Sequence, residues 1–130
     1  MIYLDTSIAL AYLLAEDRHP ADAWWAEPIV SSRLLQYEMC TWINARGLAR
    51  SHGEAVRALL ARVALIELTP LVLARALDPF PAAVRTLDAL HLASADFLRR
   101  QGQAVELASY DDRMLDAARR MELPISRHSA

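Results

Sequence analysis

The sequence of 130 residues contains no lysine, three glycines and one cysteine. With glycine only at Gly47, Gly53 and Gly102, the chain has neither a GxxxxGK[ST] phosphate loop nor a GxGxxG dinucleotide fingerprint. The single Cys40 excludes an intramolecular disulfide and a CxxC metal site. These absences exclude nucleotide-binding enzymes of both loop types and modules held together by disulfides or thiolate-bound zinc.

Long hydrophobic runs are also missing. The apolar stretch at residues 8–15 is far shorter than the roughly 20 residues that span a bilayer. It follows Asp5 and lacks a positively charged leader, so it does not resemble a signal peptide. With 55% apolar residues, 23% charged residues and a formal charge of −2, the composition is typical of a folded globular protein. We expect one domain over residues 1–130, without membrane spans, in the bacterial cytoplasm.

Short apolar runs alternate with segments of helical periodicity. Strands are expected at residues 1–4, 29–31, 65–68 and 104–108, with a weak one at 124–126. Helices are expected at residues 8–14, 33–46, 53–63, 70–77, 87–100 and 111–121, with a short one after Pro20. Thr6 or Ser7 is the expected cap of the first helix and Thr86 that of the helix at 87–100. The alternation predicts an α/β fold with a four- or five-stranded parallel sheet, flanked by helices on both faces.

Four carboxylates occupy distinctive places in this pattern. Asp5 ends the first expected strand and Asp111 follows the strand at 104–108, so both belong at the rim where ligands bind in such sheets. Glu38 and Asp88 lie on helices among apolar neighbours. Each acid alone also has an ordinary explanation, as a helix cap, a favourable first-turn charge or a solvated side chain.

Together the acids are harder to explain without a ligand. Two carboxylates about 5 Å apart repel each other by roughly 3 kcal/mol at an effective dielectric constant of 20. A rim that holds several therefore requires protonation or a bound cation. Oxygen ligands without cysteine or clustered histidine favour Mg²⁺ or Mn²⁺ over zinc. The sequence predicts a divalent metal site.

Four motifs carry a family resemblance along the whole chain. The sequence resembles PIN-domain ribonucleases, and more narrowly the VapC-type toxins of bacterial toxin–antitoxin pairs. The motifs are the IYLDTS segment at residues 2–7, the strand-then-helix segment from Ser31 to Glu38, DALHLASA at residues 88–95, and SYDDRM at residues 109–114.

The resemblance implies an acidic quartet that holds one or two Mg²⁺ or Mn²⁺ ions. Asp5 would be the central ligand, beside Asp88 and Asp111, with Glu38 ligating directly or through water. Thr6 and Ser109 match hydroxyl positions that orient water or ligands, and Ser109 stands where threonine is commoner. Asp111 is preferred as the last ligand because of its register with Met114, and Asp112 is the alternative.

The implied function is a metal-dependent endoribonuclease toxin that cleaves transfer or ribosomal RNA loops. A small VapB-like antitoxin, RNA and a second copy of the chain would be its partners. The alternative is a non-catalytic RNA- or protein-binding module on the same scaffold. A haloacid-dehalogenase-type phosphatase needs an acid where Ser7 stands, and a phospho-receiver domain needs a lysine, so neither family fits.

Other side chains leave two interpretations open. His91 lies one turn after Asp88 and either faces the acidic site or is an ordinary packed or surface imidazole, which is the favoured interpretation. Trp24, Trp25 and Trp42 are expected in the core or at an interface rather than stacked on bases, and the Trp24–Trp25 pair is a candidate wall for the antitoxin. Cys40 is expected to be inert packing.

Overall fold

A four-stranded parallel sheet forms the centre of the computed structural model, which describes residues 1–16 and 18–129. The strands are β1 (Ile2–Leu4), β2 (Ile29–Ser32), β3 (Ala64–Ile66) and β4 (Glu106–Ala108), arranged in the order β3-β2-β1-β4. This confirms the predicted parallel sheet. The weak strand expected at residues 124–126 is reduced to one parallel bridge between Leu107 and Ile125.

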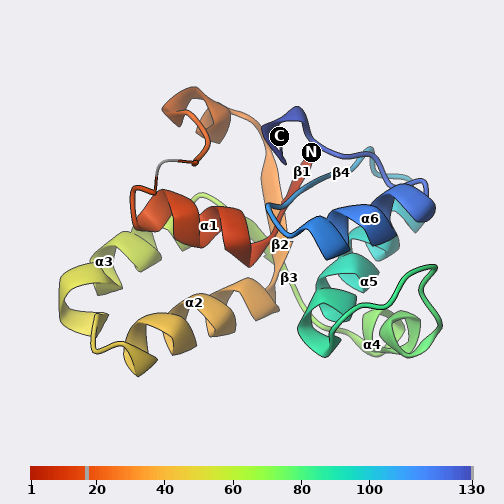
Figure 1. Cartoon of the computed structure of the whole chain (residues 1–130), viewed down its shortest axis with the longest axis horizontal. Helices are drawn as coiled ribbons and strands as arrows, with labels where there is room; N and C mark the ends of the chain where they lie inside the picture. Colours follow the sequence, from red (N-terminus) through yellow and green to blue (C-terminus); the bar gives the residue numbers. More distant parts are fainter. Residues whose placement is uncertain (17, 130) are drawn as a thin grey trace.

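Helices cover both faces of the sheet. Figure 1 shows α1, α2 and α3 on one side and α4, α5 and α6 on the other, which confirms the predicted three layers. Among the described residues, no helix is both long and apolar enough to cross a membrane. The helices are α1 (Thr6–Leu13), α2 (Arg33–Ala45), α3 (Ala49–Leu60), α4 (Pro70–Leu77), α5 (Thr86–Arg100) and α6 (Asp112–Arg120), and the short 3₁₀ segments are η1 (Asp22–Ala26) and η2 (Arg127–Ser129).

The core is divided in two by the sheet. Because successive side chains of a strand point to opposite faces, Ile2 and Leu4 pack into the cluster under α1, α2 and α3. Tyr3 instead joins the cluster under α5 and α6. Trp24 is 2% exposed and belongs to the first cluster, so its expected core position is confirmed. Burial of β1 on both faces explains why this central strand carries no charged side chain.

Two of the predicted caps were wrong. Asp5, not Thr6 or Ser7, caps α1, because Asp5 keeps the extended backbone of β1 while Thr6 is already helical. Its side chain accepts a hydrogen bond from the backbone N–H of Ser7 at 3.4 Å. Thr86 is the first residue of α5, and Arg85 holds the cap position without a side-chain cap bond. Arg85 is therefore placed at the entrance of α5.

The third helix begins four residues earlier than expected. Gly47 has a φ of +68°, a left-handed conformation that ends α2 at the predicted place. The chain turns back at once, and α3 starts at Ala49 rather than at Gly53. Gly53 instead lies buried within α3.

Candidate active site

Asp5 lies at the carboxyl end of β1, where the sheet and three helices meet. Its backbone N–H donates to the carbonyl of Ala108 at 2.9 Å, which fixes it beside β4. The residue is only 4% exposed. Its Oδ2 accepts hydrogen bonds from the hydroxyls of Ser7 at 2.6 Å and Ser109 at 2.8 Å. Two hydroxyls thus orient this carboxylate, and Ser7 was considered from the sequence only as a cap.

Asp111 has two roles at the same rim. It caps α6, because its Oδ1 accepts from the backbone N–H groups of Arg113 at 2.9 Å and Met114 at 3.2 Å. Its own backbone N–H donates to the Ser109 hydroxyl oxygen at 3.0 Å. Ser109 therefore links Asp111 to Asp5. The alternative acid, Asp112, is the first residue of α6 and is exposed.

Glu38 reaches the rim from α2. Its Oε1 accepts a hydrogen bond from the Thr6 hydroxyl at 2.8 Å and lies 2.6 Å from Nε2 of His91. His91 belongs to α5, on the other face of the sheet (Figure 1). The Glu38–His91 contact therefore joins the two helical layers across the end of β1.

His91 is a buried part of this site rather than a surface imidazole. It is 1% exposed, its Nδ1 lies 2.8 Å from the Tyr3 hydroxyl, and its Nε2 lies 3.8 Å from Oδ1 of Asp5. Burial by itself would lower the pKa of His91, but Tyr3, the hydrogen bond to Glu38 and the charge of Asp5 raise it to about 10. At neutral pH His91 is therefore protonated, and Nε2 donates to Glu38.

Asp88 and Arg85 complete the rim on the α5 side. Burial raises the pKa of the Asp88 carboxyl, and the charges of Asp111 and Asp5 raise it further, while Arg85 opposes them. The guanidinium of Arg85 contacts both acids, with Nε 3.4 Å from Oδ2 of Asp88 and Nη2 3.2 Å from Oδ2 of Asp111. Arg85 was not among the predicted site residues. Arg85 precedes Asp88 by three residues, but it lies just before α5 with an extended backbone, so no helical pattern in the sequence identifies it.

The structure brings the four predicted acids to one rim, yet each already has an internal partner. Within residues 1–16 and 18–129, no three His, Cys, Asp or Glu side chains form a group arranged to hold a metal ion. Serine hydroxyls donate to Asp5, and the side chains of His91 and Thr6 contact Glu38. Arg85 contacts the other two acids. The oxygen donors nevertheless fit a hard divalent cation. Burial raises the pKa of Asp88, and the charges of Asp111 and Asp5 add to this, so positive charge is favoured beside Asp88.

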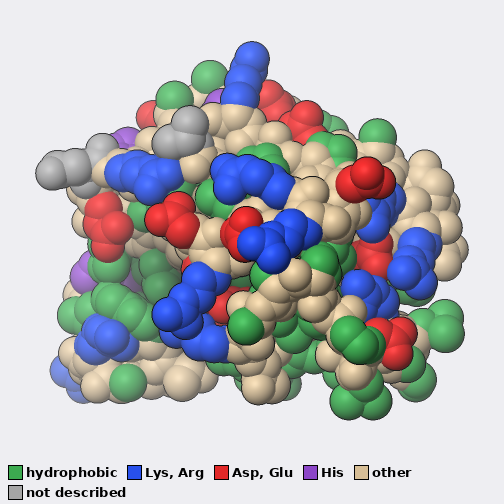
Figure 2. Space-filling view, turned by 45° about the vertical axis from the view of Figure 1, so that its right-hand side comes forward, with side chains coloured by type: hydrophobic (Ala, Val, Ile, Leu, Met, Phe, Trp, Pro, Cys, Tyr) green, Lys and Arg blue, Asp and Glu red, His purple; other side chains and the backbone are tan. Residues whose placement is uncertain are grey.

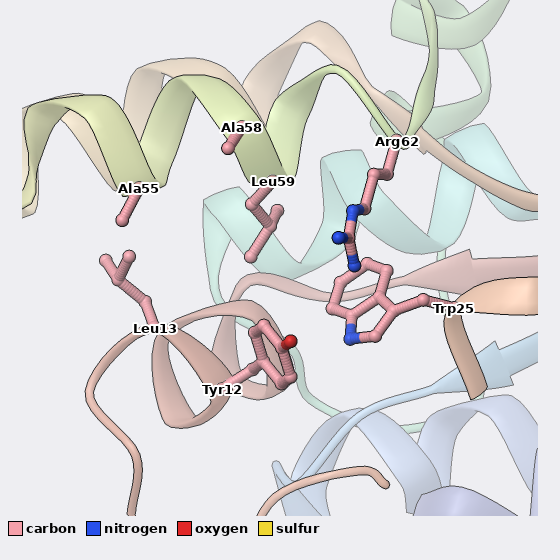
Figure 3. Close-up of a pocket in the computed structure, with 7 residues that line it drawn as sticks. All are labelled: Tyr12, Leu13, Trp25, Ala55, Ala58, Leu59 and Arg62. Carbon is pink, nitrogen blue, oxygen red and sulfur yellow. The ribbon is translucent and has the colours of Figure 1, made fainter. Parts of the chain in front are cut away.

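Two cavities lie among the elements on the α1 side of the sheet, and only one of them is lined by residues of the acidic rim. One, of about 430 Å³, is lined by Thr6 and Glu38 and continues along α2 to Trp42 and Arg46. The other, of about 210 Å³, lies between α1, η1 and α3 and contains none of the four acids. Figure 3 shows its lining, with the guanidinium of Arg62 directed toward the ring of Trp25.

Comparison with known proteins identifies the family. The model of the PIN domain matches residues 2–120 of this chain. Ribonuclease VapC46 of Mycobacterium tuberculosis (strain ATCC 25618 / H37Rv) is 34% identical over 128 residues, which cover 95% of each protein. Ribonuclease VapC47 of the same species (strain CDC 1551 / Oshkosh) is 32% identical over 126 residues, covering 92% of this chain and 90% of the relative.

A solved structure shares the fold. The crystal structure of M. tuberculosis VapC20, described as a sarcin–ricin loop cleaving toxin, superposes with a TM-score of 0.64. The superposition covers 90% of this chain and 95% of VapC20, at 23% sequence identity. The family model spans most of the chain, and VapC46 matches it nearly end to end. The chain therefore belongs to the PIN-domain family, within its VapC-type ribonucleases.

Proposed function

We propose that this protein is a Mg²⁺- or Mn²⁺-dependent endoribonuclease that acts in the cytoplasm as the toxin of a VapBC-type pair. Its substrates are transfer or ribosomal RNA, cleaved within structured loops. The proposal rests on the membership in the VapC-type family and on the acidic rim that β1, α2, β4 and α5 build together.

The convergence of three acids on one rim is the observation that carries the proposal. Burial raises the pKa of Asp88, and the negative charges of Asp111 and Asp5 raise it further, so both carboxylates lie near enough to act on Asp88. They come from three separate elements, the ends of β1 and β4 and the first turn of α5. Such convergence is costly without positive charge. Arg85 and His91 supply part of that charge in the metal-free protein, and a divalent ion would supply more.

The chain's own residues have distinct roles in this proposal. Asp5, Asp88 and Asp111 would ligate the ion, and Glu38 would ligate it directly or through water. Ser109 donates to Asp5 and Thr6 donates to Glu38, so both hydroxyls hold carboxylates in place. When bound, the divalent ion activates water for attack on phosphorus and stabilises the charge that develops on the phosphate.

The surface is consistent with recognition through a few local contacts. Figure 2 shows positive and negative side chains interspersed on the face it presents, without one broad basic area. RNA loops expose unstacked bases and phosphates that isolated arginines can bind.

A small VapB-like antitoxin and a second copy of the chain are the proposed protein partners. The apolar cavity beside Trp25 (Figure 3) is a suitable surface for a segment of the antitoxin. Trp24 is buried in the core, so only Trp25 of that pair lines this cavity.

The proposal is tested with purified protein that is free of antitoxin. Cleavage of total bacterial RNA should require Mn²⁺ or Mg²⁺, stop with EDTA and return when Mn²⁺ is added back.

Sequencing of RNA ends after expression in a bacterium should show a few defined sites in transfer or ribosomal RNA. Expression alone should arrest growth, and a small neighbouring gene product should relieve the arrest. RNA binding without cleavage in any metal would contradict the proposal and favour a non-catalytic binding module.

A further inference from the structure

Arg85 is an exposed cation that contacts two largely buried acids of the rim. Its guanidinium bridges two acids from different elements, Asp88 in α5 and Asp111 before α6. Yet its side chain is 70% exposed, whereas the side chains of Asp88 and Asp111 are 17% and 20% exposed. The guanidinium therefore covers the acidic rim from the solvent side. An exposed pair of this kind contributes little to folding stability, so stability alone does not explain the contact.

The same contact occupies two carboxylate oxygens that could otherwise bind a metal ion. Asp88 and Asp111 direct one oxygen each, their Oδ2 atoms, toward Arg85. A divalent ion that recruits these oxygens must displace a guanidinium that already neutralises them. Once displaced, an exposed arginine remains at the rim, next to the place where the phosphate of a substrate would meet the ion.

We infer that Arg85 is a phosphate-binding residue that rests as the internal counter-ion of Asp88 and Asp111 and is released to the RNA backbone when a divalent metal replaces it. This inference rests on the proposed function. Arginine suits the role because its planar guanidinium pairs with carboxylate and phosphate through the same two-pronged geometry. One side chain can therefore exchange one anionic partner for the other without losing its hydrogen bonds.

Loss of the Arg85 charge should strengthen the binding of metal and weaken the binding of RNA. In Arg85→Gln the competitor of the metal is gone, so Mn²⁺ should bind about two- to five-fold more tightly, as expected for loss of an exposed ion pair. At saturating Mn²⁺ the KM for a labelled RNA should rise about three- to ten-fold, because a charge-assisted contact to phosphate is lost, while kcat changes less. Arg85→Lys keeps the charge but loses the planar geometry, so its KM should lie between those of the other two proteins.

The experiment combines calorimetric titration of Mn²⁺ with steady-state cleavage. The matched control is Arg120→Gln, which removes another exposed arginine, paired with Asp116 on α6. Its Mn²⁺ affinity and KM should equal those of the wild type. Unchanged Mn²⁺ affinity in Arg85→Gln would overturn the competition between Arg85 and metal, and an unchanged KM would overturn the contact with phosphate. A wild-type protein that neither binds Mn²⁺ nor cleaves RNA would instead refute the proposed function, and the inference with it.

Discussion

Nε2 of His91 lies 2.6 Å from Oε1 of Glu38, and this contact joins α5 to α2 across the end of β1. Both side chains also touch Thr6, whose hydroxyl donates to Glu38 and lies 3.3 Å from the imidazole. The acidic rim therefore contains a buried cation of its own. Its charge offsets part of the repulsion among the carboxylates while the metal is absent.

The first prediction concerns the pH dependence of folding stability. The pKa of His91 is raised from 6.5 to about 10 in the folded protein, so the folded state holds more protons between these values. The stabilisation by His91 is complete below pH 6.5 and is lost as the pH rises toward 10, with a slope of up to roughly 1.4 kcal/mol per pH unit. Urea unfolding of the metal-free protein at several pH values measures this slope.

The comparison for this slope is His91→Gln, which keeps a hydrogen-bonding side chain but has no proton to lose in this range. The variant should be less stable at pH 6 and show a flatter dependence above pH 6.5. His52→Gln, on α3 and outside the site, should keep the wild-type slope. Equal slopes for wild type and His91→Gln would show that His91 is not protonated in the fold.

The second prediction concerns Asp5→Asn. Asparagine caps helices as well as aspartate does, so stability in metal-free buffer should change by less than about 1 kcal/mol. Removal of the charge should reduce RNA cleavage by orders of magnitude, because the central metal ligand is lost. Mn²⁺ should raise the Tm of the wild type through linked binding, and the variant should not respond.

Asp116→Asn is the control for Asp5→Asn, since Asp116 lies on α6 in an exposed pair with Arg120. It should keep both cleavage and the response of Tm to Mn²⁺. Full cleavage by Asp5→Asn would reject the metal site.

The third prediction concerns which of two neighbouring acids, Asp111 or Asp112, is the last metal ligand. Asp111 is tied to Arg85 and Ser109, whereas Asp112 is exposed. Asp111→Asn should abolish most RNA cleavage with little loss of stability, because asparagine still caps α6. Asp112→Asn should cleave RNA at nearly the wild-type rate. Loss of activity in Asp112→Asn with retention in Asp111→Asn would reverse the assignment of the last ligand.

The fourth prediction concerns a buried carboxylate away from the site. Asp96 is fully buried in α5, and its oxygens lie 2.9 Å from Nε of Arg75 and 2.5 Å from Nη2 of Arg99. Asp96→Asn leaves Arg75, whose side chain is only 14% exposed, without its counter-charge. The free energy of unfolding should fall by about 3 kcal/mol, whereas cleavage per folded molecule should not change.

The ion pairs of Asp96 also imply that wild type and Asp96→Asn differ in how their stability changes at acid pH. Burial alone would raise its pKa, but the hydrogen bonds from Arg75 and Arg99 lower it below 3.8. Its stabilisation is therefore present above pH 3.8 and is lost as the pH falls through the lowered pKa of the folded state. Acid unfolding followed by circular dichroism should show this loss in the wild type and not in Asp96→Asn. Equal acid sensitivity of the two proteins would contradict the role of this pair.

The sequence was sufficient for features that depend on local order along the chain. Apolar runs closed by polar residues identified the parallel strands, since most positions of a strand covered on both faces are apolar. β2 also buries Ser31, whose hydroxyl donates to the carbonyl of Leu4. The positions of Asp5 and Asp111 directly after two such runs placed both at one rim, because parallel strands end on the same side. Gly47 marked the end of α2 through its left-handed backbone.

The tertiary structure alone decided which side chains meet at that rim. The Tyr3–His91 and Thr6–Glu38 contacts join residues 88 and 32 positions apart, and they depend on which faces of α2 and α5 turn toward β1. Arg85 showed no distinguishing pattern as the residue before a helix, and only the fold brings Asp111 within 3.2 Å of it. Periodicity specifies the buried face of each element, whereas the pairing of charges follows from how those elements pack together.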